Sequence, residues 1–201
     1  MGEKVEERKE VGAGSQAVPG GALYLPLVLA SASPRRAELL SRVGIEYEVR
    51  VSGVVEEADV AGAEPAEVAE DHAREKALEV AAEVPGRLVL GADTVVVLDG
   101  RVLGKPEDAE DARRMLRGLS GRAHEVITGV ALALREAGSA ECAARVLTVE
   151  HVTTQVRFRE LSDGEIEAYV ASGEPMDKAG GYGIQGRGAL LVGEIEGCYF
   201  N

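Results

Sequence analysis

Short apolar runs separated by polar turns cover most of the chain, and the spacing inside each run predicts the element that it forms. Continuous apolar runs are typical of buried strands, and alternating runs are typical of half-buried ones. Asp99-Gly100 is a strong signal for a two-residue hairpin turn. The strands predicted in this way are residues 23–30, 47–52, 88–92, 94–98, 101–103, 124–134, 144–161, 189–192 and 194–200.

Four further segments carry helical spacing or helix end signals. Pro34 suits a first helical position, and Ser162 with Glu165 forms the sequence pattern of a capping box. In residues 64–84 the apolar stripe also contains Lys76, so this lysine either points inward or extends past the stripe to solvent. The predicted helices are residues 34–43, 64–84, 107–121 and 162–173.

The alternation of strands and helices, with hairpins among them, predicts an α/β fold with a mixed sheet. A chain of 201 residues is long enough for one core or for two lobes that share a cleft. Residues 1–21 are charged and then rich in Gly, Ala, Ser and Pro, which predicts a flexible leader. We therefore expect a single domain over residues 22–201.

Charge narrows the range of partners. The net charge is -13, so the chain repels nucleic acid, and an enzyme for anionic phosphates would need locally gathered cations or a divalent metal. The apolar run of residues 22–33 follows four glutamates and three basic residues and is too short to span a bilayer, so no membrane partner is expected. Cys142 and Cys198 have no metal-ligand spacing, which favours reduced thiols in a cytoplasmic protein.

The segment "GYGIQG" at residues 181–186 satisfies G-x-G-x-x-G, the dinucleotide-binding fingerprint. Its context does not fit, because no strand precedes it, no amphipathic helix follows it and no βαβ unit can be completed. The alternative is a flexible loop whose backbone N–H groups approach an anion or a base. Gln185 in this loop can both donate to and accept from a base edge.

The segment "SASPRR" at residues 31–36 combines hydroxyls at a strand end with a helix N-terminus and two arginines. Such a turn can cradle a phosphate, with Arg35 and Arg36 binding it bidentately. Ser31 and Ser33 supply the hydroxyls. An ordinary strand-to-helix turn with solvated arginines explains the same residues equally well.

Ionisable residues follow several of the predicted strands. Asp93 is expected at the carboxyl end of residues 88–92, where it could hold a metal or take a proton from water, or simply cap a turn. Lys105 precedes a proline, which stiffens its backbone. Glu56 and Glu57 form an acidic pair after another strand, and one of them could help to bind a metal. Together with the arginines these side chains suit a nucleoside triphosphate with Mg²⁺.

The histidines show no metal-ligand spacing and no Ser-His-Asp pattern. His72 is expected on the exposed side of its helix, and His124 is expected to be structural.

The motifs "LASASPRRAELL", "AREKA", "LGADTVVVLDGRVLGKP", "MLRGLSGRAHEVITGVAL" and "EPMDKAGGYGIQGRGAL" resemble, in order, those of the Maf-like nucleotide pyrophosphatases. The resemblance implies an elongated mixed sheet flanked by helices, with two lobes and a cleft, as in inosine triphosphate pyrophosphatases. It also implies hydrolysis of nucleoside triphosphates to monophosphate and pyrophosphate with a divalent cation (Mg²⁺ or Mn²⁺), and a possible homodimer.

Carried over by motif, the general base is Asp93, and the metal ligands are Asp93 and Glu56, with Glu57 as the alternative to Glu56. The phosphate-binding residues are Ser33, Arg35, Arg36, Lys76 and Lys105. The specificity residues are Arg35, Thr94 and Gln185, a combination that resembles the branch acting on dTTP and UTP.

Three other functions stay open on the sequence. The chain could be a nucleotide-binding regulator of cell division and septum formation with little turnover, an inosine/xanthosine triphosphate pyrophosphatase, or a structural interaction protein. The family usually continues past the position of Asn201 with a further helix, so we expect the chain either to be incomplete or to lack that element.

Overall fold

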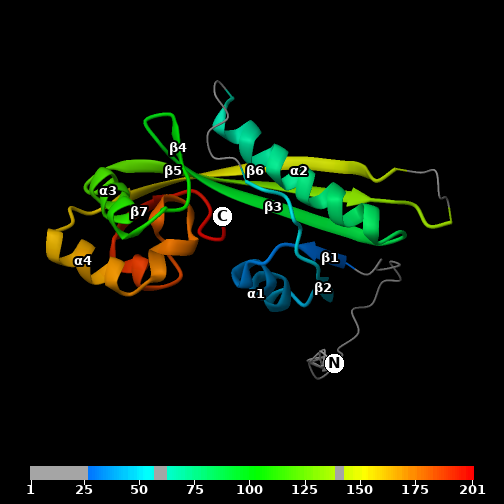
Figure 1. Cartoon of the computed structure of the whole chain (residues 1–201), viewed down its shortest axis with the longest axis horizontal. Helices are drawn as coiled ribbons and strands as arrows, with labels where there is room; N and C mark the ends of the chain where they lie inside the picture. The colour runs from blue at the N-terminus through cyan, green and yellow to red at the C-terminus, as the bar shows by residue number, and fades with distance from the viewer. Residues whose placement is uncertain (1–26, 57–62, 139–142) are drawn as a thin grey trace, which may run out of the picture.

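The computed structural model describes residues 27–56, 63–138 and 143–201, which form one seven-stranded mixed sheet with the order β2-β1-β3-β5-β6-β7 and β4 beside β3 (Figure 1). β1 pairs in parallel with β2 and β3, and the other pairings are antiparallel. The strands are β1 (Leu27–Ala30), β2 (Tyr47–Val49), β3 (Leu88–Leu98), β4 (Arg101–Leu103), β5 (Ala123–Leu134), β6 (Arg145–Phe158) and β7 (Val192–Glu196).

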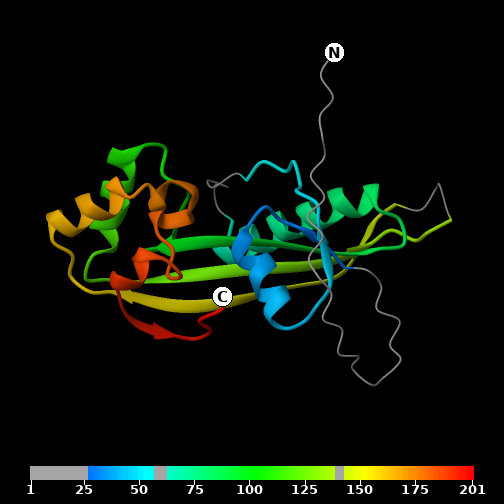
Figure 2. The ribbon, with the colours of Figure 1, turned by 90° about the horizontal axis from the view of Figure 1, so that it is seen from below.

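Helices cover the sheet unevenly. α2 lies along one face, whereas α3 and α4 gather at one end of the molecule in both views (Figures 1 and 2). Within the described ranges no helix is long and apolar enough to cross a membrane. The helices are α1 (Pro34–Arg42), α2 (Pro65–Glu83), α3 (Ala109–Leu119) and α4 (Asp163–Ala171), followed by the 3₁₀ turns η1 (Glu174–Asp177), η2 (Ala179–Gly181) and η3 (Arg187–Leu190).

The core is divided along the sheet. At one end Leu116 and Leu119 of α3 pack with Phe158 and with Ile166 of α4. At the other end the buried side chains of α2 pack on β1, β3 and β5. The long strands β3 and β5 connect the two ends, which confirms the predicted α/β fold with a mixed central sheet flanked by helices.

The backbone of α2 lies unusually close to the sheet. A β-carbon on Gly91 of β3 would collide with the carbonyl oxygen of Ala73, and one on Gly129 of β5 would collide with the carbonyl oxygen of Ala69. Ala69, Ala73 and Ala77 on the facing side of α2 are fully buried. Two glycines opposite a stripe of alanines therefore seat the helix directly on the strands.

One edge of β3 is shared by two short strands. β1 pairs with residues 88–91 and β4 with residues 96–98, so neither covers residues 92–95 on that edge. The Arg36 side chain reaches across instead, and its Nη1 donates to the carbonyl oxygen of Ala92 at 2.8 Å. The sheet is thus open beside Asp93 and Thr94.

Two sequence predictions about strands are wrong. Residues 88–92 and 94–98 form one continuous strand, because β5 pairs with β3 from Leu88 to Val97. Asp93 consequently lies in the middle of β3, and the strand that ends near it is β1. Of the predicted strand 189–192, residues 189–190 belong to the turn η3 and only Val192 is in a strand, because β7 begins there. β7 ends at Glu196, so the predicted strand 194–200 is shorter than expected. The predicted leader, residues 1–21, lies outside the described residues.

The close approach of α2 leads to a stability prediction. Gly129→Ala puts a methyl group against helix backbone, which cannot rotate away, so we expect the free energy of unfolding in urea to fall by about 1–3 kcal/mol. Gly164→Ala in the first turn of α4 is the control, since no atom lies within 4 Å of its β-carbon position, and it should be at least as stable as the parent. Equal stability of the two variants would contradict this account of the packing.

Candidate active site

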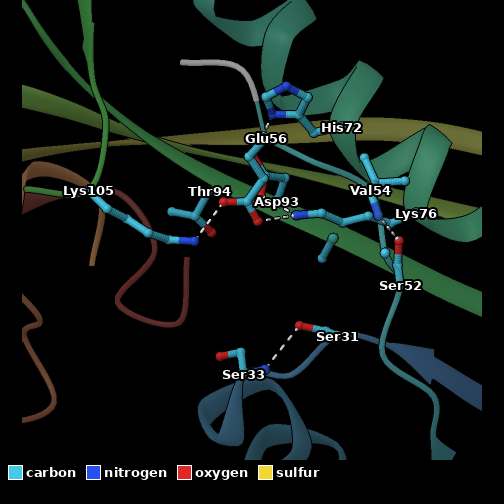
Figure 3. Close-up of polar contacts among 12 residues, drawn as sticks. Ser31, Ser33, Ser52, Val54, Glu56, His72, Lys76, Asp93, Thr94 and Lys105 are labelled. Atoms are coloured by element: carbon cyan, nitrogen blue, oxygen red, sulfur yellow. Dashed lines mark hydrogen bonds and ion pairs between the residues drawn. The ribbon is translucent and has the colours of Figure 1, made fainter. Parts of the chain in front are cut away.

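Asp93 is buried, and both of its carboxylate oxygens are hydrogen-bonded to side chains of α2 (Figure 3). Lys76 Nζ donates to Oδ1 at 2.6 Å, and His72 Nδ1 lies 3.0 Å from Oδ2. A carboxylate can only accept, so the imidazole is the donor. Lys76 and His72 lie one helical turn apart and therefore reach the same point of β3.

Charges alternate from Asp93 toward the cavity. The Lys76 ammonium also donates to Glu56 Oε1 at 2.7 Å, and Lys105 Nζ donates to Glu56 Oε2 at 2.8 Å. Burial would raise the pKa of Glu56, but the hydrogen bonds from Lys105 and Lys76 outweigh it and hold the pKa at about 2. Glu56 is therefore an anion at neutral pH, and one ammonium holds two carboxylates together.

Arg36 fixes the turn between β1 and α1 to β3. Besides Ala92, it donates to Ser31 Oγ at 2.8 Å and to Thr94 Oγ1 at 3.1 Å. Ser31 Oγ in turn accepts from the backbone N–H of Ser33 at 3.2 Å. Burial lowers the pKa of Arg36, against the attraction of Asp93. Both terminal nitrogens of Arg36 are thus already bonded within the protein.

Thr94 lies on the opposite face of β3 from Asp93, as strand alternation requires. Its hydroxyl lies 2.9 Å from that of Thr128 on β5. Asp93 and Thr94 are adjacent in sequence, yet their side chains lie on opposite faces of the sheet.

A cavity of about 1260 Å³ connects these groups. Its wall includes the SASPRR turn, Asp93, Lys105 and the loop that carries Gln185. The side chains of Arg35 and Gln185 make no hydrogen bond to any other residue in the described part of the chain. Both are therefore available to a ligand. Lys178 also lines the cavity, where its Nζ donates to the carbonyl oxygen of Glu174 at 2.7 Å.

The glycine-rich loop is built around an internal anion. The carboxylate of Glu174 accepts from the backbone N–H of Arg187 at 3.0 Å and of Gly188 at 3.2 Å. A β-carbon on Gly186 would lie 2.5 Å from this carboxylate. Burial works against ionisation of Glu174, but these backbone donors outweigh it and lower its pKa. These backbone N–H groups therefore bind a carboxylate of the protein itself, and their approach to an anion or a base of a ligand stays a prediction.

Two tyrosines anchor the same loop to the rest of the protein. Tyr169 OH accepts from the backbone N–H of Gly183 at 3.2 Å and donates to Glu174 at 3.0 Å. Tyr182 OH lies 2.7 Å from His124 Nε2, and burial lowers the pKa of His124 to about 4. His124 is a buried structural residue, as predicted. The loop is anchored to the protein at several points, which differs from the flexible loop that the sequence suggested.

The structure brings most of the predicted site together. Asp93, Lys76, Glu56 and Lys105 form one connected group, whereas Glu57 lies outside the described residues. Sequence reasoning missed His72, which was expected to be exposed and is 7% exposed. Its position four residues before Lys76, on the same helical stripe, was the available signal.

An open sheet edge with a buried carboxylate, surrounded by lysines and arginines, defines a site for a small polyanion. The comparison with protein families identifies which polyanion-binding family the chain belongs to. The model of the Maf-like proteins matches residues 26–201, and the chain belongs to this family.

Relatives in this family share half of the sequence. A dTTP/UTP pyrophosphatase of Moorella thermoacetica is 54% identical over 87% of this chain and 86% of its own length, and one of Symbiobacterium thermophilum is 53% identical over 87% and 85%. Among solved structures, a nucleoside-triphosphatase (dITP/XTP pyrophosphatase) of Mycobacterium abscessus is 20% identical, with a TM-score of 0.41 over 67% of this chain and 74% of that one.

The internal anion predicts how the loop responds to substitution. Glu174→Gln replaces a charged acceptor by a neutral amide, and a hydrogen bond to a charged group contributes about 1.5–3 kcal/mol. We expect the amide protons of Arg187 and Gly188 to exchange at least about tenfold faster. Glu167→Gln, at an exposed carboxylate on α4, is the control and should leave these rates unchanged. Unchanged exchange in Glu174→Gln would show that the carboxylate does not hold the loop.

Burial of His124 predicts a pH effect on stability. The pKa is about 4 in the folded protein and 6.5 for the free side chain, so the unfolded state binds the extra proton between these values. Stability should therefore fall as pH drops from about 6.5 to about 4, by up to about 3 kcal/mol from this group. His124→Gln should lose this part of the slope in unfolding titrations. Identical slopes for both proteins would contradict the assignment.

Proposed function

We propose that this chain hydrolyses dTTP and UTP to the nucleoside monophosphate and pyrophosphate. The observation that carries the proposal is the buried Asp93 at the open edge of β3, joined to Lys76 and facing a cavity with further cations. The names of the relatives at 54% and 53% identity support the choice of dTTP and UTP.

In the proposed reaction, water adds to the α-phosphorus and gives its proton to the Asp93 carboxylate. The bond from the α-phosphorus to the oxygen that bridges to the β-phosphorus breaks, and pyrophosphate leaves with that oxygen. A carboxylate has about four lone-pair sites. His72 and Lys76 use two of them, so acceptors remain on Asp93 for the proton.

The cations would share the charge of the triphosphate. Lys105 is half-exposed and Arg35 makes no hydrogen bond within the described residues, so both can turn to phosphate oxygens. Arg36 would contribute its charge while holding the turn that presents Ser33. Lys76 would stabilise charge that develops on the leaving group.

Asp93 and Glu56 are the residues that would hold a divalent cation. Their oxygens lie 2.6 and 2.7 Å from one ammonium, so they already share a cation. Carboxylate oxygens suit Mg²⁺ or Mn²⁺. No group of three His, Cys, Asp or Glu side chains with metal-ligand geometry occurs in the described ranges, so substrate phosphate oxygens and water would complete the shell. When bound, the ion neutralises phosphate charge.

Base recognition would fall to three residues. Gln185 and Arg35 line the cavity and offer donors and an acceptor to a pyrimidine edge. Thr94 would act from the opposite face of β3, where Arg36 fixes its hydroxyl. The homodimer, the cytoplasmic location and the lack of nucleic-acid and membrane partners stay predictions from the sequence.

Pyrophosphate release from a panel of triphosphates tests the proposal. With Mg²⁺ or Mn²⁺ we expect turnover of dTTP and UTP and little of ATP, GTP, ITP or XTP. Asp93→Asn should reduce turnover by about 100-fold or more, because a missing general base costs about that much. Asp99→Asn in the exposed hairpin turn is the control and should keep full activity.

Each competing function predicts a different result. Preferred turnover of ITP and XTP would indicate the deaminated-purine enzyme. Nucleotide binding without pyrophosphate release would indicate a regulator, and no nucleotide binding at all would indicate a structural protein. Full activity of Asp93→Asn would remove Asp93 from the role of base.

A further inference from the structure

We propose that His72 is a positioning residue for the reaction, and that it sets the orientation of the Asp93 carboxylate. The inference rests on the proposed function. It concerns a residue that the sequence placed on the exposed side of a helix and that the structure buries against the site (Figure 3).

The two oxygens of Asp93 have different partners. Oδ1 accepts from the Lys76 ammonium at 2.6 Å, and Oδ2 accepts from His72 Nδ1 at 3.0 Å. With Lys76 alone, the carboxylate could rotate about its Cβ–Cγ bond and exchange the two oxygens, because the terminal torsion of Asp is broad. The second hydrogen bond fixes the plane of the carboxylate and thus the direction of its remaining lone pairs.

The scaffold holds His72 in place for this contact. Gly91 lies two residues before Asp93 on the same face of β3, and Gly129 lies directly opposite Asp93 on β5. Because neither glycine has a side chain, the backbone of α2 can lie close to the sheet at both positions. His72 lies on α2 between these two close contacts, which are at Ala69 and Ala73. The imidazole therefore has little freedom to leave Asp93.

Orientation of the base affects the rate more than it affects binding. A misplacement of about 1 Å at a reacting group can cost about 100-fold in rate. His72 does not need to touch the substrate for this effect. Loss of its hydrogen bond should therefore lower kcat and leave the KM for the nucleotide largely unchanged.

Two substitutions separate positioning from packing. His72→Asn keeps a nitrogen donor near the Nδ1 position, whereas His72→Leu fills similar space without a donor. We expect His72→Leu to lower kcat for dTTP about tenfold or more, with KM within about twofold, and His72→Asn to recover most of the loss. Thermal unfolding of both variants is measured alongside. Equal kcat values in the two variants, whether high or low, would overturn the proposal.

A measurement without turnover tests the contact itself. In the parent protein, nitrogen-15 NMR of the histidines should show a proton on Nδ1 of His72, with slowed exchange. Asp93→Ala should shift this resonance and speed its exchange, and Asp99→Ala should not. An unaltered resonance in Asp93→Ala would overturn the inference while leaving the proposed function intact. If the parent protein releases no pyrophosphate from dTTP or UTP, both proposals fall.

Discussion

The close packing of α2 against the sheet is the constraint on which the site depends. Gly91 and Gly129 remove the side chains that would hold the helix away, and the alanine stripe of α2 has no bulk to fill the space. At this distance a lysine and a histidine one turn apart both reach Asp93. A larger residue at either glycine would raise the helix and separate its charged side chains from the carboxylate, so packing and chemistry depend on the same contact.

The open edge of β3 provides the second requirement, which is access. β1 and β4 share that edge without meeting, and a long arginine from α1 covers the backbone that they leave. The carboxylate can therefore be buried among helix side chains and still border the cavity. The same strand continues into the core under α3 and α4, so the residues beside Asp93 are held from both directions along β3.

Local patterns predicted the elements well, and the motifs contained the residues that the structure brings together around Asp93. The long helix, the hairpin and the capping box follow from residues close in sequence, and α2 (Pro65–Glu83) differs from its prediction by one residue at each end. The errors concern contacts between distant residues. Continuity of β3 through Asp93 is imposed by β5, burial of His72 by the seat of α2, and the anchoring of the glycine loop by Glu174. Spacing along the chain gave a signal for His72 through its place on the stripe of Lys76, but it does not identify β5 or Glu174 as partners.

The carboxylate inside the glycine-rich loop has a consequence for how this segment can change in evolution. Gly186 has no room for a side chain because Glu174 occupies that space, and Glu174 can remain ionised in its half-buried place because the loop surrounds it with donors. The two positions are epistatic: a change at one alters which residues are tolerated at the other. The last glycine of the spacing that imitates a cofactor fingerprint is then maintained by a partner thirteen residues before the start of η3, and the pair should vary together or not at all.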